Sequence, residues 1–312
     1  MADVKRIATR QSYGEELVAL GAEHDDFLVL DADLAAATQT GRFKAAYPDR
    51  FVDCGIAEQN LMGVAAGIAT TGHRVFASTF AMFAAGRAFE QVRNSIGYPH
   101  LHVVIGATHA GISVGEDGAT HQCNEDIALM RTIPGMTVVV PSDDVEARAA
   151  VRAAYEADGP VYLRLGRLAA PVIHGDGYRF EVGRGVVERA GSDVTVVATG
   201  LMVSSALEAA EALAAEGIDC EVVNMHTVKP LDADLVAESA AKTGRVVTVE
   251  EHSVVGGLGG AVCEALAERC PVPVRRVGVR DVFGESGPAV GLLARYGLDG
   301  AGVAESVRSF LR

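Results

Sequence analysis

The chain has 312 residues, of which 49% are hydrophobic, and it carries a formal net charge of −14 at pH 7. This length is sufficient for two domains that each bury a core. The negative charge argues against nucleic acid or an anionic membrane surface as a partner, so we expect the arginines to act singly, at sites.

Runs rich in Val and Ile alternate with helical patterns, which predicts α/β units with parallel strands. The first expected strands are near residues 27–31, 51–55, 74–78, 102–107, 137–141 and 161–165. A capping signature at 142–146 precedes a helix expected over 147–157. Turn-forming residues then interrupt the pattern between Pro171 and Gly185.

A second α/β series follows this interruption. Its expected strands are near 194–198, 220–224, 245–250 and 274–279, and its expected helices are near 203–215, 232–243 and 260–270. We therefore predict two consecutive open, mostly parallel sheet domains with helices on both faces. The predicted bounds are 1–172 and 185–312, with a linker at 173–184.

The cysteines and the start of the chain bear on its location. Five cysteines, without Cys-x-x-Cys spacing, fit a reduced protein that has no zinc site. The first six residues, Met-Ala-Asp-Val-Lys-Arg, lack the apolar core of a secretory signal, and no apolar run is long enough to span a bilayer. We expect a cytoplasmic protein without a membrane partner.

The motif Gly-Ile-Ala-Glu-Gln-Asn places Glu58 between a strand and a helix that carries no charge from Leu61 to Thr70. Such a helix is expected to be buried nearly all round. Its small residues, including Gly63 and Gly67, predict close approach of another backbone, as at an interface. The simpler interpretation of Glu58 is a first-turn carboxylate that complements the helix dipole.

Two later stretches also carry unusual side chains. Phe80 and Phe83, in Ser-Thr-Phe-Ala-Met-Phe, lie three residues apart on one face of an expected helix, where they are either core or cofactor-stacking residues. A polar, glycine-punctuated loop at 108–122 contains His109, Asp117 and His121 at the end of a strand, where open α/β sheets bind ligands. The spacing matches no compact zinc pattern, which favours substrate hydroxyl or proton-transfer contacts over metal binding.

Together, Gly-Ile-Ala-Glu-Gln-Asn, Ser-Thr-Phe-Ala-Met-Phe and Gly-Glu-Asp-Gly-Ala-Thr-His-Gln, in this order and spacing, resemble the thiamine diphosphate-dependent transketolases. The likeness covers the chain almost end to end but includes only the family's pyrimidine-binding and C-terminal domains. In the family, a preceding domain holds the cofactor's diphosphate through Mg²⁺. The chain thus resembles the C-terminal subunit of a split transketolase, whose partner is an N-terminal subunit with the diphosphate and Mg²⁺ site.

The resemblance implies cofactor contacts for four residues. Glu58 would bond a ring nitrogen of the aminopyrimidine and so promote formation of the thiazolium ylid, a catalytic role suited to a carboxyl group in an apolar joint. Phe80 and Phe83 would pack on the pyrimidine ring. Asp33 aligns with a cofactor-side acidic residue, and its alternative is a turn residue that closes a strand.

The resemblance also implies substrate contacts. Asp117 and His121 match positions that contact the donor hydroxyls near the reacting carbon, with His121 counted as catalytic, and His109 matches a position nearer the phosphate end. Arg10 and Arg167 match arginines that bind sugar phosphate, a task suited to the guanidinium fork. Their alternatives are a solvated side chain and a strand-end salt bridge.

Several segments depart from the family pattern or imitate another one. Ala-Ala-Ala at 35–37 stands where related transketolases often have a serine that helps to hold the phosphate, and 87–91 resembles the deoxyxylulose phosphate synthase version of its helix. Gly-Asp-Gly at 175–177 lacks the later Asn of the Mg²⁺ motif, and Gly-Gly-Leu-Gly-Gly at 256–260 lacks dinucleotide-loop spacing. Glu250, Glu251 and His252 end a strand and could line an interface or a regulatory pocket, but solvation is the common case for such residues, and we assign them no catalytic role.

These observations predict transfer of a two-carbon ketol unit from a ketose or its phosphate to an aldose acceptor. The expected enzyme is a heterotetramer, with two chains of each kind, that is active only with the partner subunit. No metal ligand is assigned to this chain. The enzyme alternatives are a deoxyxylulose phosphate-type synthase and the β subunit of a 2-oxo acid dehydrogenase, and the non-enzymatic alternative is a silent scaffold. The His121 motif argues against the dehydrogenase, and the intact Glu58 and Asp117 motifs argue against the scaffold.

Overall fold

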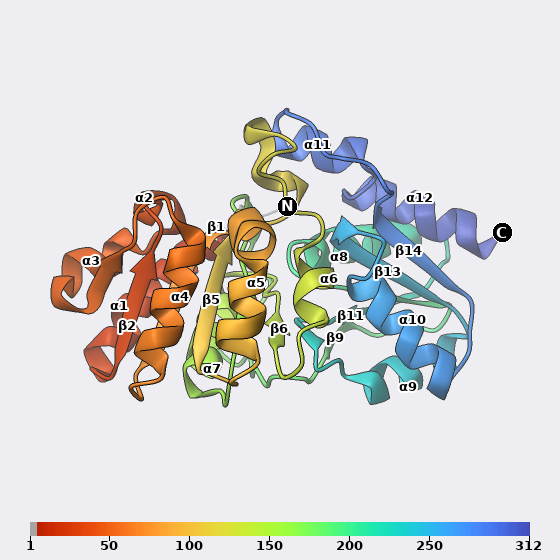
Figure 1. The fold of residues 1–312 in the computed structure, drawn as a ribbon. Coiled ribbons are helices and arrows are strands. Elements are labelled where there is room, and N and C mark those ends of the chain that lie inside the picture. The colour runs from red at the N-terminus through yellow and green to blue at the C-terminus, as the bar shows by residue number, and fades with distance from the viewer. Residues whose placement is uncertain (1–4) are drawn as a thin grey trace. The chain divides into compact units, whose positions relative to one another are not determined.

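The computed structural model describes residues 5–312, which divide into two compact units (Figure 1). The first unit contains the described residues through Ala110, together with Leu129–Val139 and Asp143–Glu181. The second contains Gly111–Ala128, Val140–Ser142 and Val182–Arg312. The segment 111–128 therefore packs within the second unit, although the sequence analysis placed it in the first predicted domain. Residues 1–4 of that predicted domain lie outside the described residues.

Six parallel strands of the first unit lie in the order β6-β7-β5-β4-β2-β3. They are β2 (Phe27–Asp31), β3 (Phe51–Asp53), β4 (Arg74–Phe80), β5 (Val103–Thr108), β6 (Thr137–Val139) and β7 (Val161–Arg164). All six expected strands are confirmed, with modest shifts at their ends. The short strands β1 (Arg6–Ala8) and β8 (Ala169–Pro171), which the sequence analysis missed, form a separate antiparallel pair.

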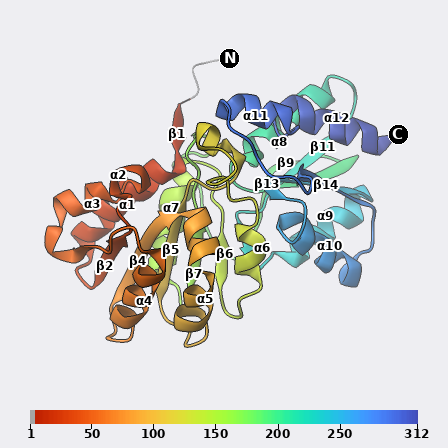
Figure 2. The ribbon, with the colours of Figure 1, turned by 45° about the horizontal axis from the view of Figure 1, so that its top comes forward.

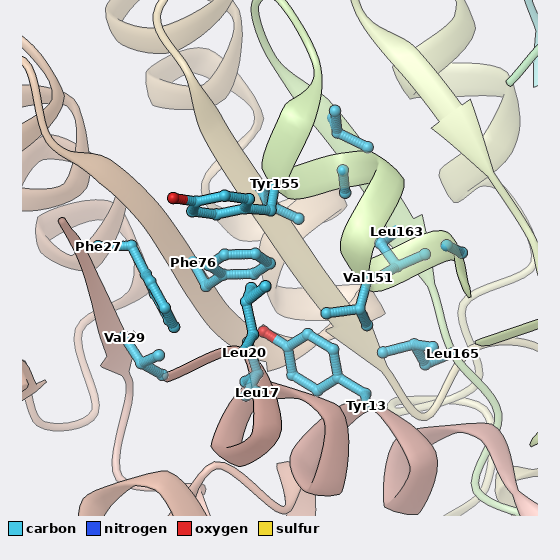
Figure 3. Close-up of a cluster of buried hydrophobic side chains, with 14 of the residues drawn as sticks. Tyr13, Leu17, Leu20, Phe27, Val29, Phe76, Val151, Tyr155, Leu163 and Leu165 are labelled. Carbon is cyan, nitrogen blue, oxygen red and sulfur yellow. The ribbon is translucent and has the colours of Figure 1, made fainter. Parts of the chain in front are cut away.

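One face of this sheet is covered by α1 (Thr9–Glu23) and α7 (Asp144–Glu156). The capping prediction for α7 is confirmed, because the Asp143 carboxylate accepts a hydrogen bond from the Glu146 N–H at 2.9 Å. Beneath these helices lies a buried aromatic and aliphatic core that includes Tyr13, Phe27 and Phe76 (Figure 3). The Tyr13 hydroxyl lies 2.7 Å from Ser78 Oγ, which satisfies its polar end inside the core.

The remaining helices of this part of the chain have six residues or fewer, apart from α4, which has 12 residues. They are α2 (Ala35–Thr38), α3 (Gly41–Ala46), η1 (Pro48–Arg50), α4 (Glu58–Ala69), η2 (Met82–Arg87), α5 (Phe89–Gln91), η3 (Val92–Gly97) and α6 (Asp126–Arg131). Both η2 and η3 are π-helices, a form often found at functional sites.

Helix α4 is not buried all round in this chain. Leu61 and Ala65 are buried, whereas Gly63 and Gly67 are exposed, and a Cβ atom added at either glycine would meet no atom within 4 Å. The expectation of nearly complete burial is therefore wrong for the single chain. The sequence of a helix shows how polar each of its faces is, but it does not show whether another part of the protein covers that face.

The second unit has a five-stranded sheet in the order β14-β13-β10-β11-β9, in which only β9 is antiparallel to its neighbour. Its strands are β9 (Val186–Arg189), β10 (Val194–Ala198), β11 (Cys220–Asn224), β13 (Val246–Ser253) and β14 (Val274–Val279). The chain also forms β12 (Thr227–Lys229). The four strands expected here are confirmed, whereas β9 and β12 were not predicted.

Helices cover both faces of this second sheet. Helices α8 (Met202–Ala214) and α12 (Gly300–Leu311) pack together on one face, and α9 (Ala233–Thr243) and α10 (Leu258–Arg269) pack together on the other (Figure 2). Helix α11 (Ala289–Arg295) lies beside η4 (Ile112–Asp117) in both ribbon views. The fold class is thus two open, mostly parallel α/β units, as predicted. No helix within residues 5–312 combines the length and apolar character that a membrane span requires.

Candidate active site

Glu58 lies where β3 gives way to α4. Gly55, with φ +69°, turns the chain between the two elements, and Glu58 then opens the helix with only 1% of its surface exposed. Its carboxylate faces a pocket of about 590 Å³. The pocket is lined by Ile56, Ala57, Glu58, Gln59, Asn60 and Arg87. A carboxylate in the first turn complements the helix dipole, but its place on a pocket wall also makes it available to a ligand.

Arg87 is the counter-ion of this carboxylate. Its Nη1 atom lies 2.7 Å from Glu58 Oε2, and its guanidinium carbon lies 4.5 Å from the centre of the Phe83 ring. Arg87 ends the π-helix η2, whose wider turn changes the direction in which side chains project. The sequence analysis assigned Arg87 no role. The available signal was a lone arginine directly after an apolar, aromatic stretch.

A stack of aromatic rings extends from the Arg87 guanidinium to the ends of the adjacent strands β4 and β5. The Phe80 and Phe83 ring centres lie 5.7 Å apart with an interplanar angle of 16°, and the rings of Phe80 and His109 lie 3.9 Å apart at 26°. Phe80 is the last residue of β4 rather than a helical residue, so the expected helical spacing of the phenylalanines is wrong. The stack forms because Phe80 and Thr108 are paired residues of adjacent parallel strands, with His109 next in the chain.

His109 is held in an unusual backbone conformation. It is 3% exposed and has a φ of +56°, which costs free energy in a residue with a side chain. Its Nδ1 atom lies 2.9 Å from Thr108 Oγ1, and its Nε2 atom lies 3.4 Å from Arg10 Nη1. A strained, buried histidine between a hydroxyl and a guanidinium is typical of a functional site.

Arg10 and Arg167 lie in the same electrostatic environment. Burial, and then the positive charge of Arg167, lower the pKa of Arg10, which remains a cation because its unperturbed pKa is so high. Arg10 Nη1 also donates a hydrogen bond to the Ala37 carbonyl at 2.7 Å. The positive charges of the two guanidinium groups repel each other, and an anionic ligand bound beside them would offset this repulsion. At the position of the expected family serine, the contact is thus with the backbone of Ala37.

Asp33 has the geometry of a turn residue. It is exposed, has a φ of +60°, and its N–H donates to Asp53 Oδ1 at 3.1 Å. The buried acid of this segment is Asp31, which accepts hydrogen bonds from Leu34 N, Thr38 Oγ1 and Thr40 Oγ1 at 2.6, 2.7 and 2.9 Å. Burial raises the pKa of Asp31 to about 6. The sequence analysis missed this carboxyl group, although it occupies the end of an expected strand.

Asp117 and His121 belong to the second unit. Asp117 is exposed at the end of η4, and His121 is partly buried, with Nδ1 2.9 Å from Thr120 Oγ1. The predicted site residues thus fall into two sets, one in each unit. The first set, in the first unit, contains Arg10, Asp33, Glu58, Phe80, Phe83, His109 and Arg167, and the second set contains Asp117 and His121.

The strand end at Glu250, Glu251 and His252 is buried, so the expectation of solvation is wrong. The Glu250 carboxylate accepts hydrogen bonds from Leu258 N and Gly259 N at 2.7 and 2.8 Å. It occupies the helix N-terminus at which a dinucleotide loop would bind phosphate, which explains why the glycine-rich segment is not such a loop. Within residues 5–312, no three His, Cys, Asp or Glu side chains gather as a metal site.

Comparison with known proteins decides the family. Residues 5–172 match the transketolase pyrimidine-binding domain, and residues 183–303 match the transketolase C-terminal domain. The chain belongs to the transketolase family. Transketolases are thiamine diphosphate-dependent transferases. The likeness stated from the three motifs is therefore confirmed.

Two relatives that the chain covers almost completely are named as a section or a subunit of a transketolase. The chain is 48% identical to a protein of Methanocaldococcus jannaschii named as a transketolase C-terminal section. The 301 aligned residues cover 96% of this chain and 94% of the relative. It is 47% identical to the 6-deoxy-6-sulfo-D-fructose transketolase subunit SqwH of Clostridium sp. (strain MSTE9), over 93% of this chain and 90% of the relative.

A solved structure agrees with these relatives. It is a split-gene transketolase described as an inactive β4 tetramer, and it matches 98% of both chains with 56% identity and a TM-score of 0.91. The chain is therefore a transketolase-family member that corresponds to the C-terminal subunit of split enzymes.

Proposed function

We propose that this chain is the C-terminal subunit of a heteromeric transketolase that transfers a two-carbon ketol unit from a ketose donor to an aldose acceptor. The observation that carries the proposal is the buried Glu58 carboxylate, which opens a helix on a pocket wall and leads through Arg87 to an aromatic stack. A buried acid near a stack of aromatic rings suits a flat, nitrogen-containing ring.

The residues present fit the pyrimidine end of thiamine diphosphate, which supplies the carbon nucleophile of the reaction when it is bound. In this proposal Glu58 holds a proton at the pyrimidine nitrogen, and Phe80 and Phe83 orient the ring by contact with its face. Arg87 bonds Oε2 of Glu58, so Oε1 would serve the ring nitrogen. Asp33 is proposed as a further cofactor-side acid.

For the substrate, we propose a sugar that carries an anionic group. Arg10 and Arg167 would hold that group, with His109 beside them, because the two guanidinium groups share one environment. The name of the related Clostridium subunit, which specifies a sulfo-sugar, supports an anionic substrate. Asp117 and His121 are proposed to contact donor hydroxyls, with His121 taking part in proton transfer.

We further propose that an N-terminal subunit holds the diphosphate and Mg²⁺, and that the enzyme is a cytoplasmic heterotetramer with two chains of each kind. The description of a 56% identical β4 tetramer as inactive supports the need for this partner. The exposed glycine face of α4 is the proposed contact surface, since Gly63 and Gly67 allow close backbone approach. The functional domains are proposed as 1–172 and 185–312, joined by a linker at 173–184.

The test is ketol transfer from xylulose 5-phosphate to ribose 5-phosphate, with thiamine diphosphate and Mg²⁺, by the chain alone and co-expressed with a candidate N-terminal partner. We expect activity only in the complex. Glu58→Ala should lower its turnover by roughly 10² to 10⁴. Glu23→Ala is the matched control, because Glu23 also pairs with an arginine, Arg152, but is exposed. Activity of the isolated chain, or normal turnover of the Glu58 variant, would refute the proposal.

A further inference from the structure

The loop 111–128, which carries Asp117 and His121, begins on a buried carboxylate of β13. The Ser113 N–H donates a hydrogen bond to Glu251 Oε1 at 2.5 Å, and Glu251 is only 5% exposed. Gly111 lets the loop approach this closely, because a Cβ atom there would lie 2.5 Å from the Glu251 carboxyl carbon, and its φ is +76°. Buried carboxylates that accept backbone N–H bonds form strong, directional contacts.

The other end of the loop rests on the next residue of the same strand. His252 is fully buried, with Nδ1 2.7 Å from the Ser253 carbonyl and Nε2 3.3 Å from the Ala128 N–H. A carbonyl can only accept, so Nδ1 must carry the proton, and Nε2 then accepts from Ala128. The Ser253 N–H also donates to the Asn124 carbonyl at 2.7 Å, which extends the attachment.

The tip of the loop is covered by the segment before α11, as both ribbon views show (Figures 1 and 2). Gln122 Nε2 donates to the Glu285 carbonyl at 2.9 Å and to the Ile112 carbonyl at 3.1 Å. At Gly118, a Cβ atom would lie 2.4 Å from Ser286 Oγ. The loop is therefore attached at both ends and packed at its tip within one compact unit.

We infer that Glu251 and His252 are positioning residues for ketol transfer, because they hold both ends of the loop that carries Asp117 and His121. The inference rests on the proposed function and gives the C-terminal domain a role in substrate geometry. Neither Glu251 nor His252 needs to touch the sugar. A small displacement of groups that orient a substrate lowers the rate steeply, by as much as 10²-fold for about 1 Å.

The experiment uses the assembled enzyme with Glu251→Ala, Glu251→Gln and Glu221→Ala. Glu221 is the matched control: it is 1% exposed in β11 of the same sheet and bonds Thr195 and Lys242 instead of the loop. Glu251→Ala should lower kcat/KM for the donor on the order of 10²-fold. It should also accelerate hydrogen–deuterium exchange in peptides that span 111–128, while thiamine diphosphate binding stays unchanged.

Glu251→Gln should recover most of the loss, because its amide oxygen still accepts the Ser113 N–H. If Glu251→Ala does not assemble, Gly111→Ala tests the same attachment from the loop side, where the added Cβ meets the carboxyl group, and the same two changes are expected. Provided that the assembled wild-type enzyme is active, either of two results would refute the positioning role. One is that Glu251→Ala loosens the loop without changing kcat/KM for the donor. The other is that Glu221→Ala has effects equal to those of Glu251→Ala. Absence of ketol transfer by the assembled wild type would instead refute the proposed function.

Discussion

The Glu58–Arg87 pair should respond asymmetrically to the loss of either partner. The two side chains are joined by one hydrogen bond of 2.7 Å, but 1% of the Glu58 side chain and 49% of the Arg87 side chain are exposed. Arg87→Ala leaves a buried carboxylate without its cation. Glu58→Gln leaves a cation that can turn toward water and still finds an acceptor in the glutamine amide.

The magnitudes follow from this difference in burial. A hydrogen bond to a charged group is worth about 1.5–3 kcal/mol, and breaking a fully buried ion pair costs about 3–5 kcal/mol. Because Arg87 is half exposed, we expect Arg87→Ala to lower the free energy of unfolding by about 2–3 kcal/mol. Glu58→Gln should lower it by about 0–1 kcal/mol, as for an exposed pair. Adding Glu58→Gln to Arg87→Ala should restore much of the loss, since no buried charge remains.

The assay is urea unfolding of the full chain at pH 7, with circular dichroism as the signal. Arg269→Ala is the matched control, because Arg269 has the same 49% exposure but pairs with Asp234, which is 73% exposed. The control should change the free energy of unfolding by no more than about 1 kcal/mol. Equal losses for Arg87→Ala and Glu58→Gln, or an Arg87→Ala loss no larger than that of the control, would contradict the reasoning.

Three further predictions concern the pH dependence, the core and the surface of α4. Burial raises the pKa of Asp31 to about 6, above its unfolded value of about 3.9, so its contribution to stability is complete below pH 4 and is lost as the pH rises through 6. Between pH 4 and 7, this titration lowers the free energy of unfolding of the wild type by up to about 3 kcal/mol, and Asp31→Asn should abolish that decrease. An equal dependence of the free energy of unfolding on pH in both proteins would argue against this. Gly106→Ala should lower the free energy of unfolding in urea by about 1–3 kcal/mol, because its Cβ would lie 2.4 Å from the buried Tyr13 hydroxyl. Gly63→Ala is the control and should not lower it, because no atom lies within 4 Å of the added Cβ. Similar losses for the two variants would show that the contact with Tyr13 is unimportant. Gly67→Leu should leave the urea midpoint of the chain nearly unchanged but weaken assembly in sedimentation velocity, whereas unaltered assembly would exclude this face of α4 as an interface.

Local sequence signals sufficed for the fold class and for most central strands. Buried parallel strands require short Val- and Ile-rich runs, and these runs are visible without knowledge of their neighbours. The motif around Glu58 likewise placed a carboxylate at a helix start, because a strand, a turn and an uncharged helix follow one another directly in the chain. Short edge strands such as β1 and β9 escaped prediction, since their few residues carry little pattern of their own.

The sequence by itself predicted which residues carry chemistry, through the motifs of Glu58, Phe80 and His121. Only the tertiary structure decided which side chains meet them. Arg87 reaches Glu58 across 29 residues, and Glu251 reaches Ser113 across 138. The periodicity of a sequence reports the polarity of each local face, whereas such contacts depend on how strands are ordered and where a π-helix turns a side chain. The burial of Glu251 and the exposure of α4 were hidden from the sequence for the same reason: burial is a property of what covers a residue.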